Sequence, residues 1–343
     1  MIILDKKNPF LIAEIGHNHQ GDIKKAFKLF EAAKFSGADA VKLQKRDNKS
    51  LYTKKFYNHI YNSENSFGKS YGEHREFLEF DEHQYNELKS YAKDLNIFFF
   101  ATAFDFQSVE FLEKLDMPAY KIASADLLNF PLQNLIAKTD KLILLSTGGG
   151  TLDQVRMAVE NICKINNNLV VMQCTSSYPV DINEMNLNVI STYKKEFPNL
   201  TIGLSDHENG IDAATIAYML GARVFEKHFT LDRASKGSDH AFSLEPQGLA
   251  KLSRNLKRVN GILGSFDKKE LKSEIDSLKK MRKFIVAAKN LSPNTIIKEN
   301  DIALKITNTD NGLTADNYYK IIGKKIKIQK LEDENILLED LNF

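Results

Sequence analysis

The chain has 343 residues, with 47 lysines and arginines against 45 aspartates and glutamates, so its formal net charge at pH 7 is only +2. This balance provides no general field for nucleic acid or for a membrane surface, and it favours small-molecule chemistry. The two cysteines, Cys163 and Cys174, have neither disulfide nor metal-site spacing, which fits a reducing compartment. Because no run of about 18 apolar residues and no signal-like segment occurs, we expect a cytoplasmic protein.

Short apolar strands alternate with amphipathic helices over roughly the first three quarters of the chain. Apolar runs such as LILLS and LVVMQ are typical of strands buried on both faces, as in parallel sheets. Eight strand–helix pairs predict an α/β fold, a (β/α)8 TIM barrel over residues 1–264. The expected strands cover residues 10–15, 40–44, 97–101, 119–122, 142–146, 169–174, 201–204 and 224–228, and the expected helices 22–36, 82–94, 105–115, 130–138, 151–165, 184–196, 210–220 and 246–262.

The connection between the second strand and the next helix is long. Residues 46–80 are polar and aromatic and show no simple helical period. Such a loop inside a compact domain is usually either functional or disordered. We therefore expect it to cover the mouth of the barrel.

The pattern changes after residue 264. Residues 265–282 are rich in lysine, glutamate and serine and predict a linker. Residues 283–343 then show short alternating runs, KFIVAAKNL, DIALKI and KKIKI, which predict a small β-rich domain. Since this domain has few catalytic types of side chain, its simplest role is packing or dimerisation.

Polar side chains end nearly every predicted strand, at the rim where barrel enzymes carry their active sites. One buried lysine could be an ion-paired structural group. Two lysines with several hydroxyls at one rim instead indicate a small, highly charged anion, because such donors replace the water that phosphate and carboxylate lose. The rim residues are Glu14, Lys42, Gln44, Thr102, Lys121, Ser124, Ser146, Ser176, Tyr178, Ser205, His207, Glu226 and His228.

His207 and His228 each follow a short apolar run, and their two strands are expected to be parallel neighbours. A pair of imidazoles at one rim suits a metal site with open positions, since imidazole binds Mn, Fe, Co and Zn. Either histidine could instead be a satisfied structural group. Asp239 adds a carboxylate just after the last strand.

Eight motifs carry a resemblance to a known family. They are AEIGHNHQGD at 13–22, GADAVKLQ at 37–44, YKIAS at 120–124, LSTGG at 145–149, QCTSSYP at 173–179, GLSDHENG at 203–210, EKHFTLD at 226–232 and GSDHAFSLEP at 237–246. The chain resembles, along essentially its whole length, the sialic acid synthases, which condense phosphoenolpyruvate with an N-acetylated hexosamine. The resemblance implies a barrel followed by a small antifreeze-like (SAF) domain, which reaches the partner's active site in a domain-swapped homodimer.

The resemblance also implies roles for individual residues. A divalent metal, most often Mn²⁺ with Mg²⁺ or Co²⁺ as alternatives, is expected on His207 and His228. Glu14 and Glu226 are candidates for orienting or deprotonating the metal-associated water, unless ion pairs with the rim lysines make them structural. Phosphoenolpyruvate is expected on Lys42, Thr102, Lys121, Ser124, Ser146, Ser176 and Ser205, and the sugar on Gln44, Tyr178 and Asp239.

Departures from the common bacterial pattern bear on the sugar. Leu304-Lys305-Ile306-Thr307 stands where bacterial members carry an arginine that reaches the partner's sugar, which leaves that swapped contact open. Residues 67–80 and 236–246 look more like the animal-type enzymes, which make N-acetylneuraminate 9-phosphate. Lys69, His74 and Lys236 are therefore expected to hold a sugar 6-phosphate, with Arg75 and Arg233 as further cations of the same two loops, unless these residues are solvated loop charges. The expected substrate is N-acetylmannosamine or its 6-phosphate, giving N-acetylneuraminate or its 9-phosphate plus phosphate.

Three alternatives stay open. The first is synthesis of another nonulosonic acid, of legionaminic or pseudaminic type, from a different N-acetylated hexose. The second is a barrel metal hydrolase, because His17-Asn18-His19 mimics an HxH motif, although the central strands lack the further histidines that such a site needs. The third is a catalytically silent carbohydrate-binding protein, which would leave the rim lysines and histidines unused.

Overall fold

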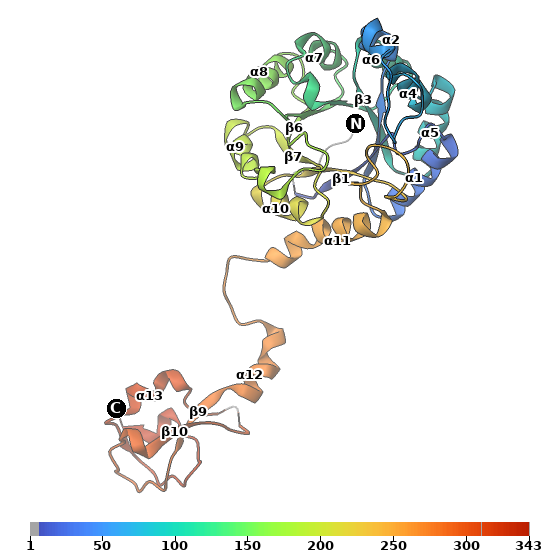
Figure 1. Cartoon of the computed structure of the whole chain (residues 1–343). Helices are drawn as coiled ribbons and strands as arrows, with labels where there is room; N and C mark the ends of the chain where they lie inside the picture. The colour runs from blue at the N-terminus through green and yellow to red at the C-terminus, as the bar shows by residue number, and fades with distance from the viewer. Residues whose placement is uncertain (1–6, 310, 343) are drawn as a thin grey trace. The chain divides into compact units, whose positions relative to one another are not determined.

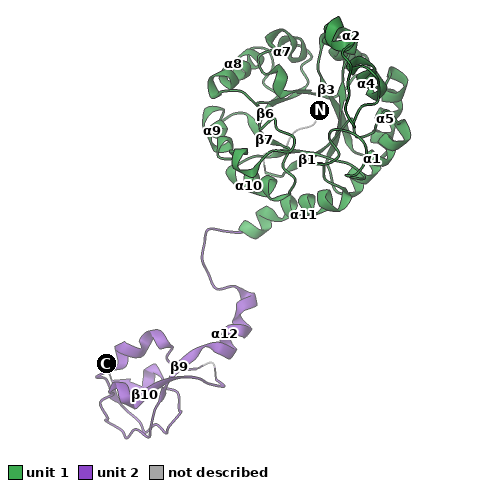
Figure 2. Ribbon diagram, in the orientation of Figure 1, with its two compact units in different colours: residues 1–263 green, residues 264–343 purple. Residues whose placement is uncertain are grey.

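The computed structural model describes residues 7–309 and 311–342. It divides into two compact units, one ending at Leu263 and the other beginning at Gly264 (Figure 2). We describe each unit by itself.

The first unit is a closed barrel of eight parallel strands, in which each strand pairs with the next and β8 pairs with β1. The strands form an inner ring with the helices outside it (Figure 1). The predicted α/β barrel is confirmed, and β3 and β7 each extend two residues further than expected. The strands are β1 Phe10–Gly16, β2 Ala40–Lys45, β3 Phe98–Ala103, β4 Ala119–Ile122, β5 Leu142–Ser146, β6 Leu169–Cys174, β7 Thr201–Asp206 and β8 Val224–His228.

Side-chain caps define the starts of several barrel helices. Asp22 accepts hydrogen bonds from the first turn of α1, and Asp81 and Thr151 form capping boxes with Gln84 and Gln154. These polar residues directly precede the amphipathic runs, so the sequence predicts where these helices begin. The helices between strands are α1 Ile23–Phe35, α5 Glu82–Asp94, α6 Phe106–Lys114, α7 Phe130–Ala137, α8 Leu152–Cys163, α9 Val189–Glu196, α10 Asp212–Leu220 and α11 Pro246–Leu263, with 3-10 turns η1 Ser124–Asp126 and η2 Ile182–Glu184.

The long connection after β2 contains helices that the sequence did not predict. They are α2 Asn48–Leu51, α3 Lys54–Tyr57 and α4 Tyr71–Leu78. Helices this short depend on caps and packing rather than on a periodic pattern. Ser70 supplies a capping box for α4, and the rings of Tyr52, Phe56 and Tyr71 pack together over it.

The barrel interior changes from apolar to polar along the strands. Ile12 in β1 and Ala119 in β4 belong to a buried apolar layer, and two residues further along the same strands stand Glu14 and Lys121. Since residues two apart point to the same face of a strand, both members of each pair face the interior. The apolar layer stabilises the barrel, with a buried side chain such as Phe100 contributing about 2–3 kcal/mol. The polar layer lies at the carboxyl ends of the strands, where its side chains are available to bind a ligand.

The second unit is small and rich in short strands and turns. β9 pairs antiparallel with β10, and β11 with β12, around a core that includes Ile285, Ile302 and Ile336. Its elements are η3 Lys272–Glu274, α12 Ile275–Met281, β9 Lys283–Ala287, η4 Glu299–Asp301, β10 Ile302–Ile306, η5 Ala315–Asn317, α13 Tyr318–Ile321, β11 Lys325–Ile326, η6 Leu338–Asp340 and β12 Leu341–Asn342. Among the described residues of both units, no helix is long and apolar enough to cross a membrane.

Candidate active site

A pocket of about 610 Å³ lies at the carboxyl ends of the barrel strands, and every strand from β1 to β8 contributes a side chain to it. This volume is within the range of small-molecule sites. The pocket brings together these sequence-predicted residues: Glu14, Lys42, Gln44, Thr102, Lys121, Ser124, Ser146, Ser176, Tyr178, Ser205, His207, Glu226, His228 and Asp239.

Four buried ionisable side chains lie deep in the pocket, and we call Glu14, Lys42, Lys121 and Glu226 the charged quartet. Lys42 Nζ lies 2.8 Å from Glu14 Oε2 and 3.7 Å from Glu226 Oε1. Lys121 Nζ lies 2.7 Å from Glu226 Oε2. The four come from β1, β2, β4 and β8, so closure of the barrel assembles them.

The two carboxyl groups of the quartet have opposite pKa shifts. Burial raises the pKa of Glu14, and the pull of Lys42 offsets this only in part. Burial also acts on Glu226, but the ammonium groups of Lys121 and Lys42 outweigh it and lower the pKa of Glu226 to about 2. Two carboxyls with separated pKa values are suited to different roles. Glu226 is therefore a fixed negative charge, whereas Glu14 can exchange a proton.

Hydroxyl groups complete the partners of the quartet. Lys42 Nζ donates to Thr102 Oγ1 at 2.8 Å, and Ser205 Oγ donates to Glu226 Oε1 at 3.2 Å. Gln44 Nε2 donates to Glu14 Oε1 at 2.8 Å. These contacts fix the heads of both carboxylates and of one lysine.

The end of β5 forms a hydroxyl-lined cradle. Gly148 N donates to Ser124 Oγ at 3.0 Å, and a Cβ at Gly148 would lie only 2.1 Å from Ser176 Oγ. Ser146 Oγ is buried and has no hydrogen-bond partner within the described residues. Since a buried donor without a partner is costly, this hydroxyl is suited to a bound anion.

His207 and His228 face one another with ring centroids 5.3 Å apart. His207 Nδ1 lies 2.9 Å from the carbonyl oxygen of Thr175. Because a carbonyl only accepts, Nδ1 donates the hydrogen bond, and in the neutral ring the lone pair of Nε2 is free to bind a metal. His228 Nδ1 is buried without a hydrogen-bond partner in the described chain and lies 3.6 Å from Asp239 Oδ2. Burial lowers the pKa of His228 to about 3 and keeps its ring neutral.

These two imidazoles fit a divalent ion that takes only two ligands from the protein. Among the described residues, no group of three or more histidine, cysteine, aspartate or glutamate side chains could hold an ion. The remaining positions would therefore fall to water and substrate. Burial lowers the pKa of His207, but contacts with Cys174 and Thr175 outweigh it and raise the pKa, so a metal would compete with a proton there.

The pocket mouth carries Arg75, one of the expected loop cations, together with residues that the sequence did not assign. Arg46 continues the two-residue alternation of Lys42 and Gln44, and this spacing could have identified it. Arg75 lies on α4, so its place depended on an unpredicted helix. The further unassigned lining residues are His17, Phe104, Ala123, Ala125, Gly148, Cys174 and Ser238.

Lys69, His74 and Lys236 were expected to hold a sugar phosphate, and the structure does not bring them to the pocket. His74 is buried among aromatic rings and its Nδ1 accepts from Phe67 N at 3.1 Å. Lys236 is exposed, with Nζ 4.8 Å from the centroid of the Phe67 ring, and Lys69 is exposed. The Phe67 ring contacts both His74 and Lys236, so these two side chains take part in the packing of the loop.

His19 also lies outside the pocket lining. Its ring stacks on Phe80 at 4.1 Å between centroids, and its Nδ1 accepts from Gly21 N. Of the two histidines in this motif, His17 lines the pocket and His19 does not. The His17 and His19 rings lie 5.9 Å apart between centroids, but only His17 reaches the pocket lining, so the motif brings one imidazole to the site rather than two.

Comparisons with known proteins agree on one family. Residues 29–268 match the NeuB family. The chain is 39% identical over 330 residues to N-acetylneuraminate-9-phosphate synthase of Homo sapiens, covering 96% of this chain and 92% of that protein. It is 37% identical over 334 residues to N,N'-diacetyllegionaminic acid synthase of Campylobacter jejuni, covering 96% and 99%. A crystal structure of N-acetylneuraminic acid (sialic acid) synthetase from Leptospira borgpetersenii aligns with a TM-score of 0.69 and 31% identity, over 80% of this chain and 91% of that one.

Proposed function

The chain belongs to the NeuB family, and from this premise we propose that it is a sialic acid synthase. It condenses phosphoenolpyruvate with N-acetylmannosamine or its 6-phosphate and releases N-acetylneuraminate or its 9-phosphate together with phosphate. The similarity to the animal 9-phosphate synthases over nearly the whole chain supports this substrate pair.

The observation that carries the proposal is the charged quartet with its hydroxyl surround. Phosphoenolpyruvate carries a phosphate and a carboxylate on a three-carbon frame. Lys42 and Lys121 supply two cations inside a pocket of about 610 Å³, next to the unpartnered hydroxyl of Ser146. Cationic and hydroxyl donors in a desolvated site stabilise this charge far more than they would in water.

Charge also governs the reaction. The methylene carbon of phosphoenolpyruvate attacks the aldehyde of the open-chain sugar, which leaves positive character on the neighbouring carbon. Water adds to that carbon, and the tetrahedral product expels phosphate to give a 2-keto-3-deoxy acid. Lys42 and Lys121 hold the phosphate and carboxylate charges throughout.

The two glutamates divide the remaining work. Glu226 stays ionised between its lysines and the hydroxyl of Ser205, so it fixes the cations and balances the positive character that develops. Glu14, whose pKa is raised and whose Oε1 is held by Gln44 Nε2, accepts and returns the proton of the attacking water.

We also propose that the enzyme depends on a divalent metal, with Mn²⁺ as the expected ion and Mg²⁺ and Co²⁺ as substitutes. His207 and His228 would hold it, with Asp239 beside His228. When bound, the ion supplies Lewis-acid polarisation of the sugar aldehyde. The buried, unpartnered Nδ1 of His228 supports this assignment.

The second unit is proposed to be an antiparallel, antifreeze-like (SAF) domain that docks on a partner barrel in a domain-swapped homodimer. Its core is small, and it exposes Leu304, Ile306, Ile328 and Leu338. Exposed apolar side chains in a small domain favour an interface. A monomer in solution with normal turnover would count against this assembly. We place the enzyme in the cytoplasm, since Cys163 and Cys174 are both free thiols.

One assay tests the function. Purified full-length protein is supplied with phosphoenolpyruvate, Mn²⁺ and a panel of sugars, and phosphate release is followed. We expect release only with an N-acetylated hexosamine, equimolar with the nonulosonic acid formed. Preference for a diacetamido sugar would assign the legionaminic or pseudaminic type instead. Phosphate release without any sugar, or none with the whole panel, would overturn the proposal.

A further inference from the structure

Two arginines from separate parts of the barrel meet at the pocket mouth. Arg46 directly follows β2 and is 8% exposed, and Arg75 lies on α4 in the long connection. Both line the same pocket as the charged quartet. Gln44 connects the charged quartet to the arginines, because its Nε2 donates to Glu14 and its Oε1 accepts from Arg46 Nη2 at 2.8 Å.

Neither guanidinium forms a direct ion pair with the described part of the chain. Within the described residues, no carboxylate oxygen lies within 4.0 Å of the side-chain nitrogens of Arg46 or Arg75. The nearby carboxylate of Glu79 pairs with Lys45 at 3.1 Å. Arg46 instead packs 3.7 Å from the centroid of the Phe104 ring, and Arg75 donates from Nε and Nη2 to Tyr71 Oη. Glu79 and Asp239 attract Arg46 and Arg75 from a distance but form no direct ion pair with them. Arg46 is buried and Arg75 is half-buried, so a bound anion would supply the direct charge partner that each lacks.

His17 lies between the two arginines and cannot satisfy both. Its Nε2 is 3.2 Å from Arg46 Nη1, and its Nδ1 is 3.4 Å from Arg75 Nη1. A neutral imidazole has one accepting nitrogen and one N–H, and arginine has no acceptor. Burial and both arginines lower the pKa of His17, so the ring is neutral. At least one guanidinium N–H therefore points at another N–H and lacks an acceptor.

We propose that Arg46 and Arg75 form an anion subsite that binds the 6-phosphate of the sugar substrate. The inference rests on the proposed synthase function and deepens it. The reacting aldehyde belongs beside the quartet, and the 6-substituent of a hexose lies at the opposite end of its carbon chain. A phosphate dianion at the mouth gives both guanidinium groups the oxygen acceptors that His17 cannot supply. The subsite takes over the role expected of Lys69, His74 and Lys236.

The test compares two sugars in matched variants of the full-length enzyme. The ratio of kcat/KM for N-acetylmannosamine 6-phosphate to that for N-acetylmannosamine is measured with saturating phosphoenolpyruvate and Mn²⁺. We expect wild type to prefer the phosphorylated sugar and Arg75→Met to lower the ratio about tenfold or more, chiefly through KM. Arg75→Lys should retain part of the preference, because lysine keeps the positive charge but cannot donate two parallel hydrogen bonds to one phosphate.

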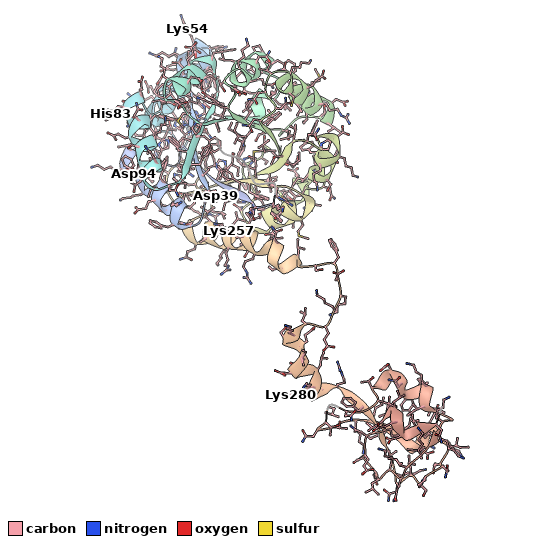
Figure 3. All side chains as sticks on the ribbon, turned by 180° about the vertical axis from the view of Figure 1, so that it is seen from behind. Asp39, Lys54, His83, Asp94, Lys257 and Lys280 are labelled. Carbon is pink, nitrogen blue, oxygen red and sulfur yellow. The ribbon has the colours of Figure 1, made fainter. Side chains whose placement is uncertain are left out.

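Lys54→Met is the matched control, because it removes one cation from the same connection at an exposed position on α3 that does not line the pocket (Figure 3). It should leave the ratio unchanged. Calorimetric titration of N-acetylmannosamine 6-phosphate without phosphoenolpyruvate gives a second readout and should show weaker binding to Arg46→Met and to Arg75→Met.

The outcomes separate the two levels of the claim. If wild type turns over neither sugar, the synthase function itself fails. If wild type works on both sugars and Arg75→Met lowers the two kcat/KM values equally, the synthase stands and the anion subsite is overturned. An unchanged affinity for the phosphorylated sugar in both arginine variants would also overturn it.

Discussion

The ion-paired carboxylates of the small unit and those of the charged quartet are satisfied in different ways. In the small unit, Asp340 Oδ2 lies 2.6 Å from Lys330 Nζ and also accepts from Leu337 N at 2.7 Å. The buried Asp301 pairs with the exposed Lys289 and also accepts from the backbone N of residue 298 at 2.9 Å. In the described part of the barrel, hydrogen bonds to the carboxylates of the charged quartet come from side chains alone: those of Gln44, Lys121 and Ser205.

The difference separates a structural ion pair from a functional one. A carboxylate that accepts from its own turn fixes local backbone, and its partners persist whatever binds nearby. A carboxylate held only by side chains from distant strands can share those partners with a ligand. Similar chemistry therefore stabilises a turn in one unit and prepares an anion site in the other.

The largest expected effect comes from Lys121→Met. It should lower kcat/KM for phosphoenolpyruvate by about 1,000-fold, because a cation that faces the anion is lost. It should also reduce the free energy of unfolding by about 3 kcal/mol, since Glu226 is left less compensated. Lys330→Met in the small unit is the control, with a comparable loss of stability but turnover of the folded protein within about threefold. Equal losses of turnover in both variants would show that the quartet acts as a structural ion pair, like that of the small unit.

His228→Ala should lower turnover about 100-fold or more and leave the fold intact, because the Nδ1 of His228 makes no hydrogen bond within the described chain. Wild type treated with a chelator should show the same loss, and Mn²⁺ should restore it. Thermal unfolding of the variant checks the fold. Full turnover of His228→Ala in chelator would remove the metal from the account.

Gly148→Ala tests the hydroxyl cradle. The added Cβ would lie 2.1 Å from Ser176 Oγ and 2.8 Å from Ser124 Oγ, so the cradle must open. We expect KM for phosphoenolpyruvate to rise about tenfold or more, with little change in KM for the sugar. Gly261→Ala is the control, since its Cβ would meet nothing within 4 Å. A rise in both KM values would point to general distortion of the barrel.

The smallest effect concerns pH and the small unit. The ion pair with Lys289 and the N–H of Lys298 outweigh burial and hold the pKa of Asp301 below its ordinary value of 3.8. This stabilisation is present above pH 3.8 and is lost as the pH falls through the lower folded-state pKa. Asp301→Asn should therefore cost about 1 kcal/mol near pH 6, and the difference from wild type should shrink below pH 3.8. Denaturant unfolding at several pH values measures it, and a pH-independent difference would contradict the assignment.

The sequence predicted the barrel and most of the pocket because both follow from two-residue alternation. Ile12 followed by Glu14, or Ala119 followed by Lys121, records an apolar layer and then a polar rim on one face. Once the strands close into a barrel, these rim positions must converge.

The mouth could not be predicted in the same way. The short helix that carries Arg75 depends on the cap at Ser70 and on aromatic packing rather than on a period. The side chain of His74, one residue earlier, points into that packing. The charged residues of the long connection therefore identified the right segment of the sequence. Only the structure of α4 shows that the side chain of Arg75, and not that of His74, lines the pocket.

The central claim is that the charged quartet binds phosphoenolpyruvate through exchangeable side-chain partners. A calorimetric titration of phosphoenolpyruvate into the full chain, without sugar, tests this most directly. We expect saturable binding of one molecule per chain to wild type and to Lys330→Met, and binding weakened about 100-fold or more in Lys121→Met. Equal affinity in wild type and Lys121→Met would contradict it.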